Sequence, residues 1–288
     1  MSRIAIIDGD VLAYQACKPR WQSKAKIENG VSFVSLDEHG KKVPLEFTVE
    51  EDRKYLEESW TNFEKILNQM LETLFCTDYL MAVKSGPSYR DLMYPIELNE
   101  EKTKAIWGYK ANRWKPESEQ NKFVKTLREL AIFEGLAIPA IGREADDYVR
   151  IWANEARECG DDYVICSIDK DLQCIPGMHY LMHKEDFVEV TPQAATRHYY
   201  EQLLKGDPTD NVPGVPRIGE VKASKILDQY DTEEEFQECV VSHYIEAYGD
   251  NWFDYFLSNA KMIHIQRDMN DFFRPAEWPI LRELCNLK

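Results

Sequence analysis

The stretch IAIIDGD, residues 4–10, places four consecutive apolar residues directly before two aspartates. An apolar run without polar alternation is typical of a strand that is buried on both faces, as in a parallel sheet. Asp8 and Asp10 follow where this strand ends, and on an extended chain their side chains would point to the same side. The stretch therefore predicts a parallel sheet with acidic residues at the carboxyl end of its first strand.

Strand and helix patterns alternate along the rest of the first two thirds of the chain. Short apolar runs predict further strands at 79–83, 163–168, 179–182 and 186–190. Apolar residues at helical spacing predict helices at 11–17, 52–75, 118–134, 144–158 and 192–204. Residues 26–50 alternate weakly, which indicates an inserted β-hairpin. This order predicts an α/β domain at 1–205 whose mainly parallel sheet is flanked by helices, followed by a helical region at 206–288.

The charge of the chain is concentrated in particular places. Its 288 residues include 35 Lys and Arg against 51 Asp and Glu, for a net charge of −16. Such a balance argues against a protein that is basic all over and binds nucleic acid through phosphate contacts. Nine of the acids, however, form four clusters near element ends: Asp8, Asp10, Glu144, Asp146, Asp147, Asp169, Asp171, Asp207 and Asp210. Without these nine acids the net charge of the chain would be −7.

Each acidic cluster alone has an ordinary structural explanation, because acids commonly cap helices and form turns. Ligands of a parallel sheet, however, collect beyond the carboxyl ends of its strands, where these clusters would meet. Carboxylates that converge repel one another and need compensation, which two Mg²⁺ or Mn²⁺ ions with oxygen ligands supply. The chemistry expected from such a site is two-metal hydrolysis of a phosphodiester.

Residues 102–128 reverse the sign of the charge, with eight Lys and Arg against Glu117 and Glu119. Within them, WGYKANRWK at 107–115 interleaves cations with aromatic rings, which suits a nucleic-acid strand because bases stack on rings while cations contact phosphates. The candidate DNA contacts are Tyr109, Lys110, Arg113 and Lys115. The alternative is a solvated helix face with a few buried aromatic residues.

A second candidate for phosphate binding is NVPGVPRIGEVKASKIL at 211–227. Gly214 and Gly219 bracket a tight hairpin, and a helix is expected from about Glu220. Glycines let backbone N–H groups approach phosphates closely, and a helix N-terminus adds a positive partial charge. Lys222 and Lys225 would add contacts to a DNA backbone. The alternative is a plain packing element of two helices and a turn.

Five motifs occur in a telling order: DGD (8–10), GYKANR (108–113), EADD (144–147), SIDKDL (167–172) and GDPTDNVPGVPRIG (206–219). Over about residues 4–230 the chain thereby resembles the 5′-nuclease family of flap endonucleases and 5′→3′ exonucleases, most of all those of phages. The resemblance implies a PIN-like domain with an arch at about 86–125 and a helix–three-turn–helix at 207–228.

The resemblance also assigns roles to residues. Asp8, Glu144 and Asp146 resemble ligands of a first metal ion, and Asp169, Asp171 and Asp210 those of a second. Asp147 and Asp207 resemble carboxylates that act through water, and Lys110 and Arg113 resemble catalytic cations at the base of the arch. The carbonyls of Gly214, Val215 and Ile218 resemble those that hold K⁺ against duplex DNA. The family's further aspartate after the second strand is missing at Val83–Ser85, and we expect Asp10 to supply its charge.

These observations predict a Mg²⁺-dependent 5′→3′ exonuclease with flap or RNase H-like activity that leaves 5′-phosphates during DNA replication or primer removal. The expected substrates are duplex DNA with a 5′ end or flap, or an RNA–DNA hybrid. A catalytically weak DNA-structure-binding module and an RNA-directed PIN-type ribonuclease are the alternatives. Seven cysteines without a CxxC pair and the lack of an 18-residue apolar run predict a cytoplasmic protein without disulfides or membrane contact. We expect a monomer.

Overall fold

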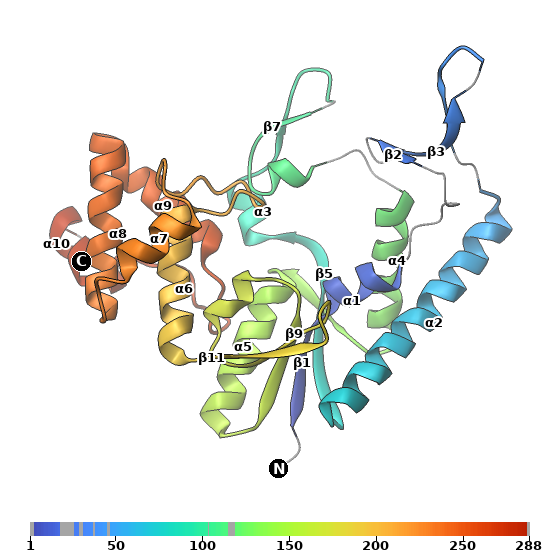
Figure 1. The fold of residues 1–288 in the computed structure, drawn as a ribbon, viewed down its shortest axis with the longest axis horizontal. Coiled ribbons are helices and arrows are strands. Elements are labelled where there is room, and N and C mark those ends of the chain that lie inside the picture. Colours follow the sequence, from blue (N-terminus) through green and yellow to red (C-terminus); the bar gives the residue numbers. More distant parts are fainter. Residues whose placement is uncertain are drawn as a thin grey trace.

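A mostly parallel sheet forms the centre of the molecule (Figure 1). The computed structural model describes residues 3–17, 26–28, 31–36, 38–44, 47–102, 104–114 and 119–286. The sheet has the order β11-β10-β9-β1-β5-β8. Its strands are β1 (Ile4–Asp8), β5 (Asp78–Ser88), β8 (Ile138–Gly142), β9 (Tyr163–Ser167), β10 (Gly177–Leu181) and β11 (Asp186–Val190). Only β11 pairs antiparallel, with β10.

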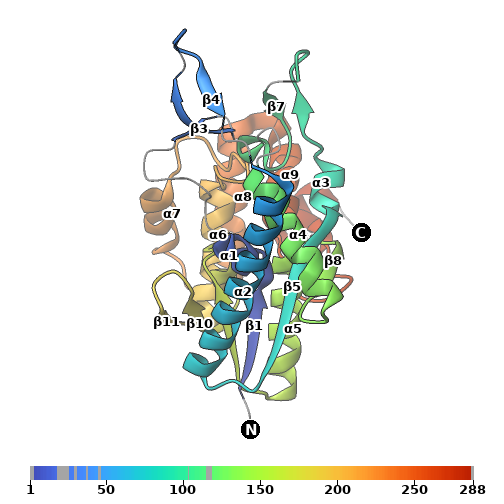
Figure 2. The ribbon, with the colours of Figure 1, turned by 90° about the vertical axis from the view of Figure 1, so that its right-hand side faces the viewer.

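Helices cover both faces of this sheet, as the apolar run of β1 predicts. Ala5 and Ile7 point into a core shared with α1 (Gly9–Ala16), α2 (Val49–Leu74) and α4 (Glu119–Phe133). Ile6 points the other way, into a core with Val149 of α5 (Ala145–Cys159). Successive residues of a strand face opposite sides, so each apolar residue of β1 is used. Figure 2 shows α2 lying in front of the sheet alongside β5.

Two projections rise beyond the carboxyl end of the sheet (Figures 1 and 2). One is the predicted insert, an antiparallel sheet of β2 (Lys26–Glu28), β3 (Val31–Leu36) and β4 (Lys42–Pro44). The other lies in the predicted arch and contains α3 (Tyr89–Met93), the hairpin of β6 (Glu97–Leu98) and β7 (Ala105–Trp107), and the 3₁₀ turn η1 (Ala111–Arg113). The described part of the arch is therefore built largely on a β-hairpin.

The C-terminal region is helical, as expected. After residue 205 it contains α7 (Glu220–Leu227), α8 (Glu233–Tyr248), α9 (Trp252–Ile263) and α10 (Pro279–Cys285), with short 3₁₀ turns η3 (Gly249–Asn251) and η4 (Pro275–Glu277). The preceding helix α6 (Pro192–Lys205), expected in the sheet domain, packs with these helices. Leu203 and Leu204 of α6 belong to its core. Ile265 returns to the core under α5, so the regions interlock. The division into 1–205 and 206–288 stays a prediction. No helix in the described ranges is long and apolar enough to cross a membrane.

Two local features differ from the sequence analysis. The expected extended path from Asp8 to Asp10 is wrong, because α1 already begins at Gly9 and Asp8 caps it by accepting a hydrogen bond from Asp10 N. Gly9 makes this tight start possible, since a Cβ there would lie 2.7 Å from the carbonyl oxygen of Ala82. The sequence analysis also missed β8, whose five residues include a proline and a glycine that are uncommon in strands.

Candidate active site

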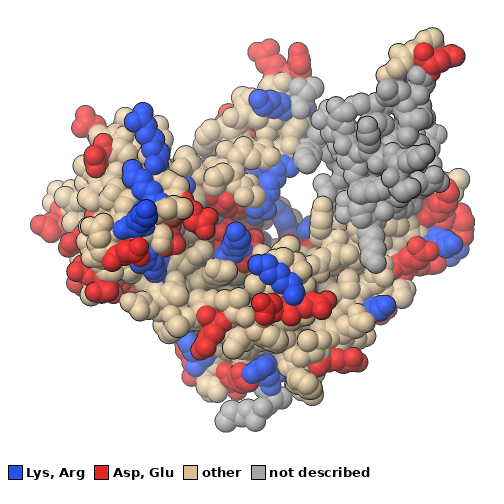
Figure 3. Space-filling model, viewed as in Figure 1, with Lys and Arg blue, Asp and Glu red and all other residues tan. Residues whose placement is uncertain are grey.

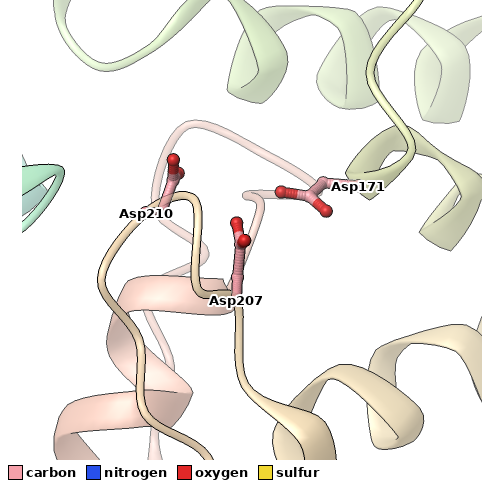
Figure 4. A group of neighbouring side chains, drawn as sticks. All are labelled: Asp171, Asp207 and Asp210. Atoms are coloured by element: carbon pink, nitrogen blue, oxygen red, sulfur yellow. The ribbon is translucent and has the colours of Figure 1, made fainter. Parts of the chain in front are cut away.

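Three aspartates from two distant segments meet at the carboxyl end of the sheet. Asp171 begins the 3₁₀ turn η2 (Asp171–Cys174) after β9, whereas Asp207 and Asp210 lie in the loop after α6. Each offers an oxygen within 4.8 Å of the others, and Figure 4 shows the three side chains around one space. A backbone bridge between Asp207 and Val212 closes the loop. The sequence thus correctly predicts that the SIDKDL and GDPTDN motifs converge.

A chain of hydrogen bonds connects the ends of β1 and β9. Ser167 Oγ donates to Asp8 Oδ2 at 2.9 Å and accepts from Asp169 N at 3.0 Å. Asp169 Oδ1 in turn accepts from Asp171 N at 2.9 Å. The side chain of Gln202 on α6 donates to Asp171 Oδ1 at 2.7 Å. Neighbouring strand ends therefore hold the acids at defined positions without neutralising them.

Burial and, to a smaller extent, repulsion from neighbouring acids raise the pKa values of three of these carboxylates. Burial raises the pKa of Asp8 to about 7, with further contributions from Asp10 and Asp169. Burial together with Asp8 and Asp169 raises the pKa of Asp146 well above its ordinary value. Burial, Asp169 and Asp207 raise the pKa of Asp171 to about 8. The negative charge of Asp169 raises the pKa of Asp8, Asp146 and Asp171 alike, so the carboxylates at the end of β1, in α5 and in η2 belong to one electrostatic cluster.

This cluster fits hard divalent cations. Glu144, Asp146, Asp171, Asp207 and Asp210 all line one pocket of about 20 Å³, which is wide enough for a water molecule or an ion. Mg²⁺ and Mn²⁺ prefer carboxylate oxygens and water, and a bound cation would relieve the repulsion that raises these pKa values. The assignment of individual acids to a first and a second ion stays a prediction.

Lys110 and Arg113 contact the carboxylates directly. Lys110 Nζ donates to Glu144 Oε1 and lies 3.7 Å from Asp210 Oδ2, and Arg113 Nη2 pairs with Asp210 Oδ1. Lys110 has a φ of 58°, a left-handed conformation that is rare for lysine and concentrates at functional sites. Its N–H donates to Asp210 O at 2.9 Å. Burial would raise the pKa of Glu144, but Lys110 and Arg90 lower it to about 2.

Tyr109 has a different role from the one expected. Its side chain is buried, and its hydroxyl lies 2.9 Å from both Glu144 Oε2 and Asp210 Oδ2. The expectation that it contacts DNA is therefore wrong, because a buried ring cannot stack on a base. Aromatic residues in a basic stretch do not reveal by themselves which ring packs inside. Lys115, the other expected DNA contact here, lies outside the described residues.

Arg90 on α3 is a central residue that the sequence analysis missed. It is fully buried, and it donates to both oxygens of Asp147 at 2.9 Å and to Glu144 Oε2 at 3.0 Å. Asp147 also accepts from the backbone N–H groups of Glu144 and Gln266. These four hydrogen bonds use the acceptor capacity of one carboxylate. Asp147 therefore holds Glu144 in place. We expected Asp147 to contact a metal ion through a water molecule, but in this arrangement its oxygens are already used by these four hydrogen bonds.

Lys84 lies in the part of β5 beside the end of β1, where the aspartate expected from the resemblance is missing. Lys84 N donates to Asp10 Oδ1 at 2.8 Å, and Lys84 Nζ lies 3.3 Å from Asp91 Oδ2. Asp10 also pairs with Arg128 of α4 at 2.8 Å. Because Asp10 is close enough to raise the pKa of Asp8, it supplies negative charge beside the first strand. As a substitute metal ligand, Asp10 would have to share its carboxylate with its present partners, Lys84 N and Arg128.

The glycine hairpin forms as expected. Gly214 has a φ of 62°, and a Cβ there would lie 2.2 Å from the backbone nitrogen of Gly206, so the hairpin packs tightly on the end of α6. Gly219 caps the N-terminus of α7. Lys222 and Lys225 are exposed. Figure 3 shows Lys and Arg side chains over α7 and around a hollow in the middle of the same face. Two of the candidate K⁺ ligands already accept hydrogen bonds, Gly214 O from Tyr248 and Val215 O from Ile218 N.

No family model matches the chain, but curated relatives exist among bacterial polymerases. DNA polymerase I of Rhizobium leguminosarum is 35% identical over 132 residues, 42% of this chain and 13% of the polymerase. The thermostable DNA polymerase I of Thermus aquaticus is 29% identical over 166 residues, 54% of this chain and 20% of that protein. DNA polymerase I of Bacillus subtilis is 32% identical over 195 residues, which are 62% of this chain and 21% of the polymerase. The chain spans about a fifth or less of the length of these relatives.

Solved structures of bacteriophage T5 proteins share the fold along most of the chain. A T5 protein co-crystallised with metal ions has a TM-score of 0.54 at 12% identity, covering 90% of this chain and 89% of that one. A T5 flap endonuclease in complex with DNA and metal ions has a TM-score of 0.53 at 12% identity, covering 91% and 99%. The expected α/β fold with a mainly parallel sheet is therefore confirmed, and it is shared with these T5 proteins. In sequence, part of the chain is similar to part of bacterial DNA polymerase I.

Proposed function

We propose that the chain is a Mg²⁺- or Mn²⁺-dependent 5′→3′ exonuclease with flap or RNase H-like activity. One observation carries this proposal: acids from the ends of β1 and β9, the start of α5 and the loop after α6 interact electrostatically in a partly buried place beside Lys110 and Arg113, and Asp171, Asp207 and Asp210 among them lie within ligating distance of one another. Two divalent ions, when bound, would activate water and stabilise the charge of the transition state. The residues that would hold them are Asp8, Glu144, Asp146, Asp169, Asp171 and Asp210, with Asp207 nearby.

The roles of the cations follow from their contacts. Lys110 and Arg113 lie against the carboxylates, so a scissile phosphate at this rim would meet two positive charges in a partly buried place. Positive charge held where negative charge develops lowers the barrier of the chemical step. Gly219 at the start of α7, with Lys222 and Lys225, supports a contact to duplex DNA backbone without base recognition. A K⁺ ion held by the carbonyls of Gly214, Val215 and Ile218 belongs to the same proposal.

The test uses 5′-labelled duplex, flap and RNA–DNA hybrid substrates with Mg²⁺, Mn²⁺ or EDTA. We expect metal-dependent products with 5′-phosphates and loss of turnover in Asp171→Asn, a change that keeps the size of the side chain. Asp254→Asn on the exposed face of α9 is the matched control and should stay active. Cleavage by Asp171→Asn in EDTA would overturn the two-metal mechanism. Tight flap binding without turnover in either metal would instead favour a DNA-structure-binding module, and a strict preference for RNA 5′ strands a PIN-type ribonuclease.

A further inference from the structure

A second cavity, of about 420 Å³, lies between α5, α6 and C-terminal residues 264–278. This volume falls in the range of small-molecule sites. Arg150 and Arg157 of α5 line it, and the helical rise places them about 9 Å and about 20 Å from Glu144 along the helix axis. The cavity thus extends away from the carboxylate rim, toward the opposite end of the sheet. In Figure 1 the C-terminal segment passes beside α6 and α5 here.

The lining of this cavity is cationic, although the chain as a whole is acidic. Four arginines line it against two carboxylates, those of Glu233 and Glu277. Arg267 is bound to Asp271 at 2.9 Å, and Arg274 lies 3.7 Å from Glu277. Within the described ranges Arg150 and Arg157 have no carboxylate partner: Arg150 donates to Ile265 O at 2.8 Å, and Arg157 to the side chain of Asn154. Two guanidinium groups are therefore available to an anion.

Tyr199 adds a donor to the same wall. Its hydroxyl oxygen is buried and has no hydrogen-bond partner among the described residues. Buried hydroxyl groups nearly always have a partner, because leaving one unpaired costs free energy. Arg150 and Arg267 are near enough to counter the rise that burial causes in the pKa of Tyr199. The rings of Phe273 and Trp278 line the cavity as well and provide an apolar surface.

We propose that this cavity binds a phosphate monoester joined to a planar ring, the chemistry of a nucleoside monophosphate. Arg150, Arg157 and the hydroxyl of Tyr199 would contact the phosphate, and the aromatic wall would contact the ring. A phosphate monoester offers three strong acceptor oxygens and close to two negative charges, which matches two guanidinium groups and one hydroxyl. A carboxylate carries only one negative charge against the two guanidinium charges, so it would balance the charge of this set less well than a phosphate monoester.

The cavity shares a wall with the carboxylate pocket. Met262, Ile263 and Ile265 line the carboxylate pocket, whereas His264 and Arg267 line the second cavity. The carbonyls of Met262 and His264 also accept hydrogen bonds from Arg90. Arg150, a proposed ligand contact, also donates to the carbonyl of Ile265 in this segment, so a bound ligand would steady the backbone behind the active site. We expect binding to raise the melting temperature.

The experiment measures binding by calorimetry in EDTA, so that it does not depend on the nuclease activity. The probes are dAMP, deoxyadenosine and inorganic phosphate. We expect dAMP to bind most tightly, with affinity reduced about tenfold in Tyr199→Phe, the size expected for one hydrogen bond to a charged group. Arg157→Gln should also weaken binding, whereas Tyr255→Phe, at an exposed tyrosine of α9, should not. Because the hydroxyl of Tyr199 has no protein partner, Tyr199→Phe should melt at the same temperature as the native chain or higher.

Three results would overturn the proposal. The first is no binding of dAMP to the native chain. The second is binding that survives in Tyr199→Phe and Arg157→Gln but is lost in Lys110→Ala, which would place the nucleotide at the catalytic rim. The third is equal binding of deoxyadenosine and dAMP, which would remove the phosphate from the interaction.

Discussion

Arg90 and Asp147 form a two-point ion pair inside the protein, with two N–O distances of 2.9 Å and both side chains buried. The pair joins the base of the arch to the first turn of α5. Arg90 also reaches the carbonyls of Met262 and His264, so three segments that are far apart in sequence depend on one guanidinium group. The position of Glu144 at the metal rim follows from this arrangement.

Removing Arg90 should destabilise the whole fold. In Arg90→Ala the carboxylate of Asp147 stays buried without its partner, which typically costs about 3–5 kcal/mol. We expect a loss of this size in the free energy of unfolding, measured by urea denaturation. Arg53→Ala removes a guanidinium group from exposed pairs with Glu50 and Glu57 and should change stability little. Similar small losses in both variants would contradict the role given to Arg90.

Lys110→Ala should separate catalysis from binding. Its charge lies against Glu144 and near Asp210, where it would act on the transition state, so we expect single-turnover rates to fall about 10²–10³-fold. The dissociation constant for flap DNA, measured in Ca²⁺, should change far less. Lys222→Ala at the start of α7 should show the opposite pattern. Equal losses of rate and affinity in Lys110→Ala would contradict a catalytic role.

The metal-free protein should lose stability as the pH rises from about 4 to about 8, and the loss should level off above that. Asp8 and Asp171 have pKa values of about 7 and about 8 in the folded chain, against an ordinary value of 3.8. The folded state therefore binds more protons than the unfolded state between these values, and stability decreases as the two acids ionise. Scanning calorimetry in EDTA should show the decrease. Saturating Mg²⁺ should raise the melting temperature and flatten this slope, because bound cations stabilise the ionised acids.

Asp171→Asn provides the control for this titration. It removes one of the two groups, so the slope of melting temperature against pH should be smaller than in the native chain. A native chain whose melting temperature responds to neither pH in this window nor Mg²⁺ would show that the acids do not form one cluster.

Gly214→Ala and Gly219→Ala should have different consequences. A Cβ at Gly214 would collide with the backbone of Gly206 in a left-handed conformation, so we expect a clear loss of melting temperature and of the loop that carries Asp207 and Asp210. Gly219 has open space around the position of a Cβ and no positive φ. Gly219→Ala should therefore melt like the native chain but bind duplex DNA more weakly. A stable Gly214→Ala variant would contradict the close packing of the hairpin.

Most strand and helix positions in the main sheet domain could be predicted from sequence, because its strands are continuous apolar runs and the helical spacing is regular, but the order of the strands in the sheet could not. The acids of EADD and SIDKDL could be placed at one rim since they open a helix or follow a strand, whereas those of GDPTDN lie in a loop after a helix and were placed there by the order of the motifs. The backbone path from Asp8 to Asp10 could not be predicted. The helix α1 begins at Gly9, directly after the strand, and this early start depends on the close packing of Gly9 against β5.

The supporting residues were harder to find. Arg90 lies in no recognisable pattern: the SxxD capping box of α3, Ser88 with Asp91, accounts for its neighbours, and an arginine in a polar stretch is normally exposed. The buried state of Tyr109 depends on the turn at Lys110 docking on residues 207–212, a contact between segments about a hundred positions apart. Long-range polar contacts of this kind leave no periodic signal in a sequence.

The backbone of residues 262–266 holds Arg90 and Asp147, although it follows Asp8 by more than 250 residues in the sequence. During synthesis the acids of the rim would emerge long before the segment that fixes Glu144 among them. A nascent chain released before residue 266 would keep its carboxylates but lack the backbone groups that orient them. Under the proposed function, cleavage would therefore have to wait until residues 262–266 have been synthesised and have packed against Arg90 and Asp147.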